Sequence, residues 1–135
     1  MSVGLVLITH QPLAADLVRV AAGIYGNCPA RIETLEVEND APRDRVLAAA
    51  QRLLVQLDEG DGVLILTDIY GATPANLALA ACAQHPRCRV LSGVNLPMLL
   101  RAITYAGLDL DAVAEKALEG GRAGVRLCPA AGPED

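Results

Sequence analysis

Val3-Gly4-Leu5-Val6-Leu7-Ile8-Thr9, followed at once by His10, is the stretch of sequence that decides the fold. An unbroken run of aliphatic and β-branched residues is typical of a strand that is buried on both faces, as the strands of parallel sheets are. Residues 62–67, Gly-Val-Leu-Ile-Leu-Thr, form a second run of this kind and end at Asp68. Because both faces of such strands must be covered, we expect helices on both sides of the sheet.

Helical patterns alternate with strand patterns along the rest of the chain. The expected helices run from Pro12 to a stop at Gly26, from a cap region at 39–42 to Gly60, and over 73–83, 96–105 and 109–118, where Gly120-Gly121 ends the last one. Further short strands are expected at 31–37, 89–92 and 124–127. This alternation predicts an α/β fold: a single domain over 1–128 with a doubly wound, mainly parallel sheet, and a flexible tail at 129–135.

Composition excludes several classes of protein. The chain has 135 residues, of which 53 % are hydrophobic and 20 % charged, which fits one folded domain and excludes disorder. A net charge of −5 and an aromatic content of 2 % argue against nucleic-acid binding. No apolar run reaches the length of a membrane span, and no signal-peptide pattern precedes the first strand, so we expect a cytoplasmic protein.

The four cysteines do not form a metal-binding pattern. Cys28, Cys82, Cys88 and Cys128 include no C-x-x-C pair, and no histidine stands at ligand spacing to them. We therefore expect reduced thiols, no metal site and no cofactor.

Polar residues that follow the buried strands are the candidates for function. In doubly wound sheets, ligands bind outside the carboxyl ends of the strands, where the strand order reverses. His10 follows the first strand, Asp68 follows the strand at 62–67, and the loop 93–95 follows the strand at 89–92. Each residue taken alone also fits an ordinary cap or turn.

Together these residues suggest a histidine that can be phosphorylated. A neutral imidazole is a good nucleophile near pH 7, and a carboxylate on its other ring nitrogen fixes the tautomer and stabilises the positive ring. Asp68 is the candidate for that partner. The small residues Gly71 and Ala72 lead into Thr73-Pro74, expected as N-cap and first residue of a helix, whose free N–H groups suit an anion.

Three segments resemble a known family: residues 7–14 (Leu-Ile-Thr-His-Gln-Pro-Leu-Ala), 67–76 (Thr-Asp-Ile-Tyr-Gly-Ala-Thr-Pro-Ala-Asn) and 92–100 (Ser-Gly-Val-Asn-Leu-Pro-Met-Leu-Leu). In order and spacing they are similar to the enzyme IIA domain of the mannose-type branch of the bacterial phosphoenolpyruvate:sugar phosphotransferase system (PTS). The resemblance extends over nearly the whole chain.

The resemblance implies a phosphoryl-carrier function, a phosphotransferase activity. His10 would accept a phosphoryl group from the phosphocarrier HPr and pass it to a IIB component for sugar uptake, with Asp68 bonded to its ring and the Thr73 hydroxyl nearby. It also implies a homodimer in which the strand 124–127 joins the partner's sheet. The family usually has Gly after the histidine, whereas this chain has Gln11. The chain ends near Asp135, so we expect no fused IIB domain.

In-line phosphoryl transfer requires both protein partners to cover the edge of the sheet around His10. We therefore expect Tyr70 with its loop, and Asn95, Leu96 and Pro97, to contact partners.

Other functions stay open at this point. They are a phosphorylation-state regulator, the phosphoryl-donor subunit of a dihydroxyacetone kinase, and a non-catalytic regulatory module of the same fold. A response-regulator receiver domain is disfavoured, because the first strand ends in Thr9-His10 rather than an acidic pair. His85 receives no role, and the sequence does not name a sugar.

Overall fold

The strands form one parallel sheet. The computed structural model describes residues 2–129, and within them β1 (Gly4–His10), β2 (Ile32–Val37), β3 (Val63–Thr67) and β4 (Cys88–Leu91) lie in the order β2-β1-β3-β4. From β1 the chain moves outward to β2, then crosses back to β3 and on to β4, so the order reverses between β1 and β3. The predicted doubly wound parallel sheet is confirmed.

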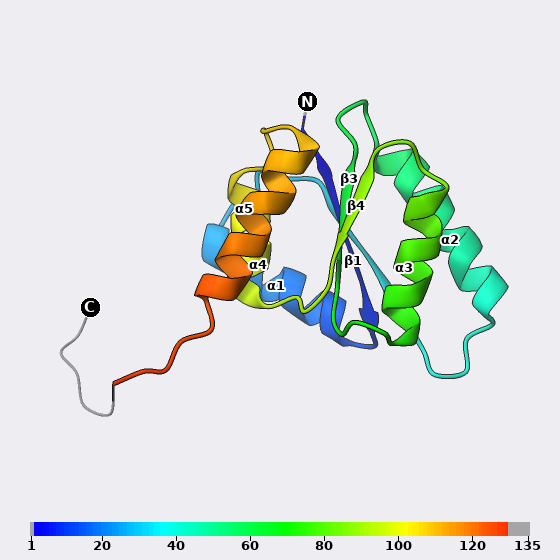
Figure 1. Ribbon diagram of the computed structural model, residues 1–135, viewed down its shortest axis with the longest axis horizontal. Helices are drawn as coiled ribbons and strands as arrows, with labels where there is room; N and C mark the ends of the chain where they lie inside the picture. The colour runs from blue at the N-terminus through cyan, green and yellow to red at the C-terminus, as the bar shows by residue number, and fades with distance from the viewer. Residues whose placement is uncertain (1, 130–135) are drawn as a thin grey trace.

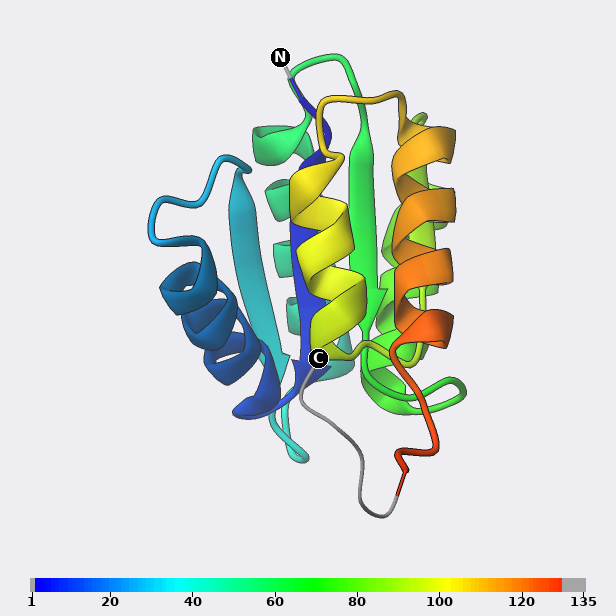
Figure 2. The same cartoon turned by 90° about the vertical axis from the view of Figure 1, so that its left-hand side faces the viewer.

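Helices cover both faces of this sheet (Figure 1). One face carries α1 (Leu13–Tyr25), α4 (Leu96–Thr104) and α5 (Leu110–Ala123), and the other carries α2 (Arg43–Leu57) and α3 (Thr73–Ala83). Figure 2 shows the first of these layers in front of the sheet, with the strand arrowheads all pointing to the lower edge. Strand-to-strand crossovers are right-handed, so a chain that turns back across the sheet places its next helices on the opposite face.

The two central strands are buried because their side chains alternate between two cores. Leu5 and Leu7 of β1 pack toward α1, α4 and α5, whereas Val6 and Ile8 pack toward α2 and α3, and all four are 0 % exposed. Burying one such side chain fully stabilises the fold by about 1.5–3 kcal/mol. The apolar runs therefore specify central strands, as the sequence predicted.

The last helix is longer than predicted. α5 continues through Gly120 and Gly121 to Ala123 instead of stopping at Leu118. Both glycines are buried against α4: a Cβ on Gly120 would overlap the side chain of Arg101, and one on Gly121 would lie 2.8 Å from Cε of Met98. These glycines let two helices approach closely rather than break one, which sequence alone does not distinguish.

Three helix boundaries also differ from the prediction. Pro12 and Ala72 are the N-cap residues of α1 and α3, so Pro12 is not the first helical residue, and Thr73 begins α3 instead of capping it. The start of α1 is capped by side chains from other parts of the chain. Thr9 Oγ1 accepts a hydrogen bond from the N–H of Ala14 at 2.9 Å. Glu36 Oε2 accepts one from the N–H of Ala15, also at 2.9 Å. α2 ends at Leu57 rather than Gly60.

The segment 124–127 forms no strand within the described chain. It leaves the end of α5 and extends away from the body of the protein (Figure 1), with Val125 77 % and Leu127 101 % exposed. A strand needs a neighbouring strand to pair with, and among residues 2–129 none lies beside this segment. The tail predicted at 129–135 lies outside the described residues, apart from Pro129.

Candidate functional site

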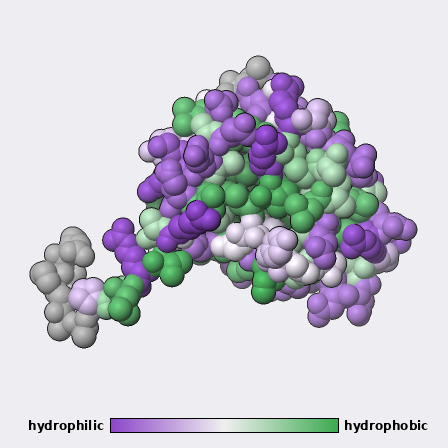
Figure 3. Space-filling model, in the orientation of Figure 1, coloured by the Kyte–Doolittle hydropathy of each residue, from purple (hydrophilic) through white to green (hydrophobic). Residues whose placement is uncertain are grey.

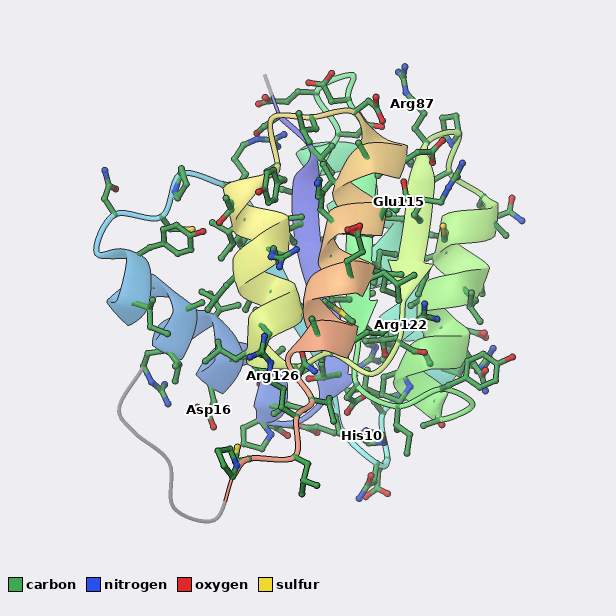
Figure 4. The ribbon with its side chains drawn as sticks, turned by 60° about the vertical axis from the view of Figure 1, so that its left-hand side comes forward. His10, Asp16, Arg87, Glu115, Arg122 and Arg126 are labelled. Atoms are coloured by element: carbon green, nitrogen blue, oxygen red, sulfur yellow. The ribbon has the colours of Figure 1, made fainter. Side chains whose placement is uncertain are left out.

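His10 and Asp68 meet at the point where the strand order reverses. His10 ends β1 and Asp68 directly follows β3, so the parallel register of the two strands brings both residues to one edge of the sheet. Figure 4 shows His10 at this edge. His10 Nδ1 lies 2.7 Å from Asp68 Oδ2, and the backbone N–H of His10 donates to the same oxygen at 3.0 Å. The predicted pair is therefore in place, held by ring and backbone together.

The carboxylate of Asp68 is stabilised in its charged form. Burial by itself raises the pKa of Asp68, but the hydrogen bonds from the His10 backbone, the His10 ring and the Ile69 N–H outweigh it. The resulting pKa lies below the ordinary value of 3.8. At neutral pH the ring therefore faces a negatively charged acceptor.

This acceptor determines which ring nitrogen is free. A carboxylate can only accept, so Nδ1 carries the proton, and Nε2 holds the lone pair in the neutral ring. The His10 side chain is 43 % exposed, against 12 % for Asp68. The arrangement leaves Nε2 of the neutral His10 ring with a free lone pair on a half-exposed side chain, whereas the Asp68 carboxylate is mostly shielded from solvent.

Two buried threonines, one near the end of β1 and one at the end of β3, differ in their bonding. Thr9 Oγ1 donates to the carbonyl of His10 at 2.8 Å and also caps α1, so it fixes the backbone beside the His10 ring. Thr67 is equally buried at 0 % exposure, yet its Oγ1 has no hydrogen-bond partner in the described structure.

The loop after β2 forms a wall of the site that the sequence analysis missed. A hollow of about 310 Å³ lies between His10 and Gln11 on one side and Glu38, Asn39 and Asp40 on the other. A narrower one lies between His10, Arg43 and the start of α3 at Thr73. The signal was available in part, because residues 38–42 follow a strand that we placed in the sheet. From sequence alone, residues 39–42 indicate only a helix cap.

The loop between β3 and α3 lies where the sequence placed it. Gly71 has a φ of 88°, which favours glycine, and it turns the chain into the N-cap Ala72. Thr73 lines the narrow hollow beside His10, so the structure places its side chain at the same edge of the sheet as the His10 ring. Tyr70 is 80 % exposed and free to contact another protein.

The loop after β4 closes against the site from the other side. The N–H of Gly93 donates to the carbonyl of Asp68 at 3.1 Å. Asn95, which we expected to contact a partner, uses its side chain internally: Oδ1 accepts from the N–H of Met98 at 3.0 Å and Nδ2 donates to the carbonyl of Gly121 at 3.0 Å. Leu96 and Pro97 are half-buried beside it.

The second histidine lies in a different kind of pair. His85 Nε2 is 2.7 Å from Asp58 Oδ2, but both side chains are only 10 % exposed. Asp58 also accepts from the N–H groups of Gly60 and Gly62, so the pair joins the turn after α2 to the end of α3. This pair links two elements of the fold, and its ring is closed to a partner.

Fold and site together define a class: a doubly wound α/β protein with a half-exposed histidine bonded to a less exposed carboxylate at the switch point of its sheet. The comparison with known families narrows this class. The chain belongs to the EIIA-man family, described as PTS system fructose IIA component, whose model matches residues 4–118. The resemblance stated from the sequence is thereby confirmed.

Individual relatives agree with this family. The PTS system mannose-specific EIIAB component of Escherichia coli (strain K12) is 27 % identical over 132 residues, 96 % of this chain and 41 % of that protein. The chain thus spans about two fifths of the length of this curated relative. A solved structure, the mannose/sorbose specific IIA subunit of the phosphotransferase system from Enterococcus faecalis, has a TM-score of 0.78 at 25 % identity, covering 99 % of this chain and 100 % of that one.

A further solved structure shares the fold alone. It is the sigma-54 interaction domain protein from Enterococcus faecalis, with a TM-score of 0.77 at 15 % identity over 91 % of this chain and 93 % of that one.

The described part of the chain holds neither a metal-binding cluster nor a membrane-spanning helix. Among residues 2–129, no group of three or more His, Cys, Asp or Glu side chains is placed to hold a metal ion. None of the helices there has the length and apolar character that crossing a bilayer requires.

Proposed function

We propose that this protein carries a phosphoryl group on Nε2 of His10, accepting it from an HPr-type phosphocarrier and passing it to a PTS IIB component. The observation that carries the proposal is the bond between Nδ1 of His10 and Oδ2 of Asp68 at 2.7 Å. It leaves Nε2 as the free nucleophile on a ring that is 43 % exposed.

The transfer is a displacement at phosphorus. The lone pair of His10 Nε2 forms the new N–P bond as the bond between phosphorus and the donor's histidine breaks, and that electron pair returns to the donor ring. Nδ1 keeps its proton throughout. Asp68 stabilises the positive ring that forms, and the same steps in reverse deliver the group to the next acceptor.

The loops at this edge of the sheet are the proposed contact surface for both partners. Ile69 and Tyr70 are 58 % and 80 % exposed, and they project from the loop that begins at Asp68. Because donor and acceptor must each reach His10, they use overlapping surfaces and cannot bind together. We expect each interface to stay near or below about 1,200 Å², as transient complexes do.

A homodimer is part of the proposal. β4 is an edge strand, paired only with β3, and Figure 3 shows apolar residues gathered in the middle of the face where Figure 1 shows this strand, between α5 and α3. The extended segment 124–127, with its exposed Val125 and Leu127, has the length and character to pair with that edge in a second copy. A cytoplasmic location completes the proposal, and the four free cysteines suit such a reducing compartment.

A labelling experiment tests the carrier function. The protein is incubated with phosphoenolpyruvate, enzyme I and HPr, and acid-labile phosphate is measured by intact mass. We expect one phosphoryl group on the wild-type protein, none on His10→Ala and the wild-type yield on His85→Ala, the matched control. Labelling of His10→Ala at the wild-type yield would contradict the assignment. A separate assay with candidate IIB proteins identifies the downstream acceptor, and failure of every acceptor would favour a regulator that reports phosphorylation state.

A further inference from the structure

Arg43 is the first residue of α2 and lines the narrow hollow beside His10 and Thr73. Among the residues that line the two hollows at His10, it is the only arginine or lysine.

The charge around His10 makes a cation there significant. Asp68 holds the ring, and Glu38 and Asp40 line the hollows, so the site is rich in carboxylates. A phosphoryl group adds about −1.5 to −2 charges at pH 7. Bringing that charge among carboxylates is unfavourable unless a positive group faces it, and the planar guanidinium of arginine fits phosphate oxygens through two parallel hydrogen bonds.

Arg43 is available for this contact. Three other arginines are engaged with carboxylates: Arg19 with Asp16, Arg31 with Glu59 and Arg89 with Asp111. Within residues 2–129, the guanidinium of Arg43 forms neither an ion pair nor a side-chain hydrogen bond. Its side chain is exposed, so it can turn toward the ring without breaking an ion pair or a side-chain hydrogen bond.

We propose that Arg43 binds the phosphoryl group on Nε2 of His10, which makes it a residue of the phosphoryl site rather than of the surface. The inference rests on the proposed carrier function. Arg43 exchanges no proton and forms no covalent bond. It contacts the phosphoryl oxygens while the N–P bond forms at Nε2 and the bond to the donor breaks.

The test uses phosphoramidate, a small phosphoryl donor. Because this donor has no protein surface, a substitution at Arg43 cannot act by changing how a partner protein docks. The phosphorylated protein is then titrated by ³¹P NMR. Removing a facing cation makes the second ionisation of the phosphoryl group harder. We expect the ³¹P titration midpoint of Arg43→Gln to lie about half a pH unit or more above that of the wild type. Arg43→Lys should recover part of the difference.

Arg45→Gln is the matched control. It removes the same charge two residues further along α2, from an exposed side chain that lines neither hollow at His10. We expect this variant to titrate like the wild type, and thermal unfolding checks that both variants are folded. If Arg43→Gln and Arg45→Gln titrate alike, Arg43 does not contact the phosphoryl group, although the carrier function stands. If neither phosphoramidate nor phospho-HPr labels the wild-type protein, the carrier function itself is wrong.

Discussion

One oxygen of Asp68 accepts two hydrogen bonds from the same residue, at 3.0 Å from the backbone N–H of His10 and at 2.7 Å from Nδ1 of its ring. The carboxylate thus fixes the end of β1 and the ring attached to it in one contact. Because the second oxygen accepts from the N–H of Ile69 at 3.0 Å, the carboxylate cannot rotate without losing a bond. The orientation of Nε2 follows from this double contact.

Asp68→Asn should keep the fold and slow phosphoryl transfer. The amide oxygen can still accept from a backbone N–H, but it offers no charge to stabilise the positive ring. Loss of the equivalent carboxylate costs about 10⁴-fold in hydrolytic triads. We expect a smaller loss of about 10- to 100-fold here, since the donor is already activated. Single-turnover transfer from phospho-HPr measures it, and a rate equal to that of the wild type would remove Asp68 from the mechanism.

Stability at acid pH should depend on Asp58. Burial by itself raises the pKa of Asp58. The hydrogen bonds from His85, Gly60 and Gly62 lower this pKa by more than burial raises it, so the folded pKa lies below the ordinary 3.8. A carboxyl group whose pKa is lowered on folding stabilises the protein fully above its unfolded pKa, and this contribution is lost as the pH falls through the folded pKa.

Asp58→Asn isolates this charge, because the amide oxygen still accepts from Gly60 and Gly62. We expect the free energy of unfolding at pH 7 to fall by about 1–3 kcal/mol. The difference between the two proteins should shrink as the pH is lowered below 3.8. Urea unfolding at several pH values measures it, and a constant difference across that range would contradict the assignment.

Thr67→Val should stabilise the protein. The buried hydroxyl of Thr67 has no partner in the described structure, and valine has nearly the same shape without the polar atom. We expect a gain of about 1 kcal/mol in the free energy of unfolding, by removal of an unpaired polar group. Thr67→Ser is the control: it keeps the hydroxyl, loses a buried methyl group and should be about 1 kcal/mol less stable than the wild type. A destabilised valine variant would mean that the hydroxyl is paired in solution.

Truncation after Gly124 should abolish the proposed dimer. The cut leaves α5 complete, which ends at Ala123, and removes all but the first residue of the segment 124–127 that we expect to cross to the partner's β4. Light scattering with size-exclusion chromatography should find monomer or aggregate. A chain that ends at Pro129 is the control and should remain dimeric. Monomeric full-length protein at micromolar concentration would refute the exchanged strand.

Tyr70→Glu should weaken transfer both from HPr and to a IIB component. The side chain is 80 % exposed, so the substitution places a charge on the proposed contact surface and leaves the core unchanged. We expect each transfer rate at limiting partner concentration to fall about 10-fold, as loss of an interface aromatic does, with the melting temperature nearly constant. Val55→Glu, at an exposed position of α2, should change neither rate. Equal rates for the two variants would place the contact surface elsewhere.

The sequence by itself determined the layered fold and the pairing of His10 with Asp68. Central strands of a parallel sheet must be apolar on both faces, so the unbroken apolar runs at 4–8 and 63–66 predict the two central strands. Since the carboxyl ends of parallel strands share one edge, His10 and Asp68 could be brought together from sequence alone.

Only the tertiary structure decided what depends on neighbours distant in the chain. In the sequence, Gly120 and Gly121 look like a helix end, because glycine destabilises a helix wherever it occurs. What favours glycine here is the close approach of α5 to Arg101 and Met98, which only the packing of α4 against α5 shows. Asn95 looks like a loop contact until Gly121 is found beside it. Arg43 and Glu38 belong to the site because β2 lies next to β1 in the sheet, with Val37 opposite His10, and that adjacency is set by strand order rather than by any motif.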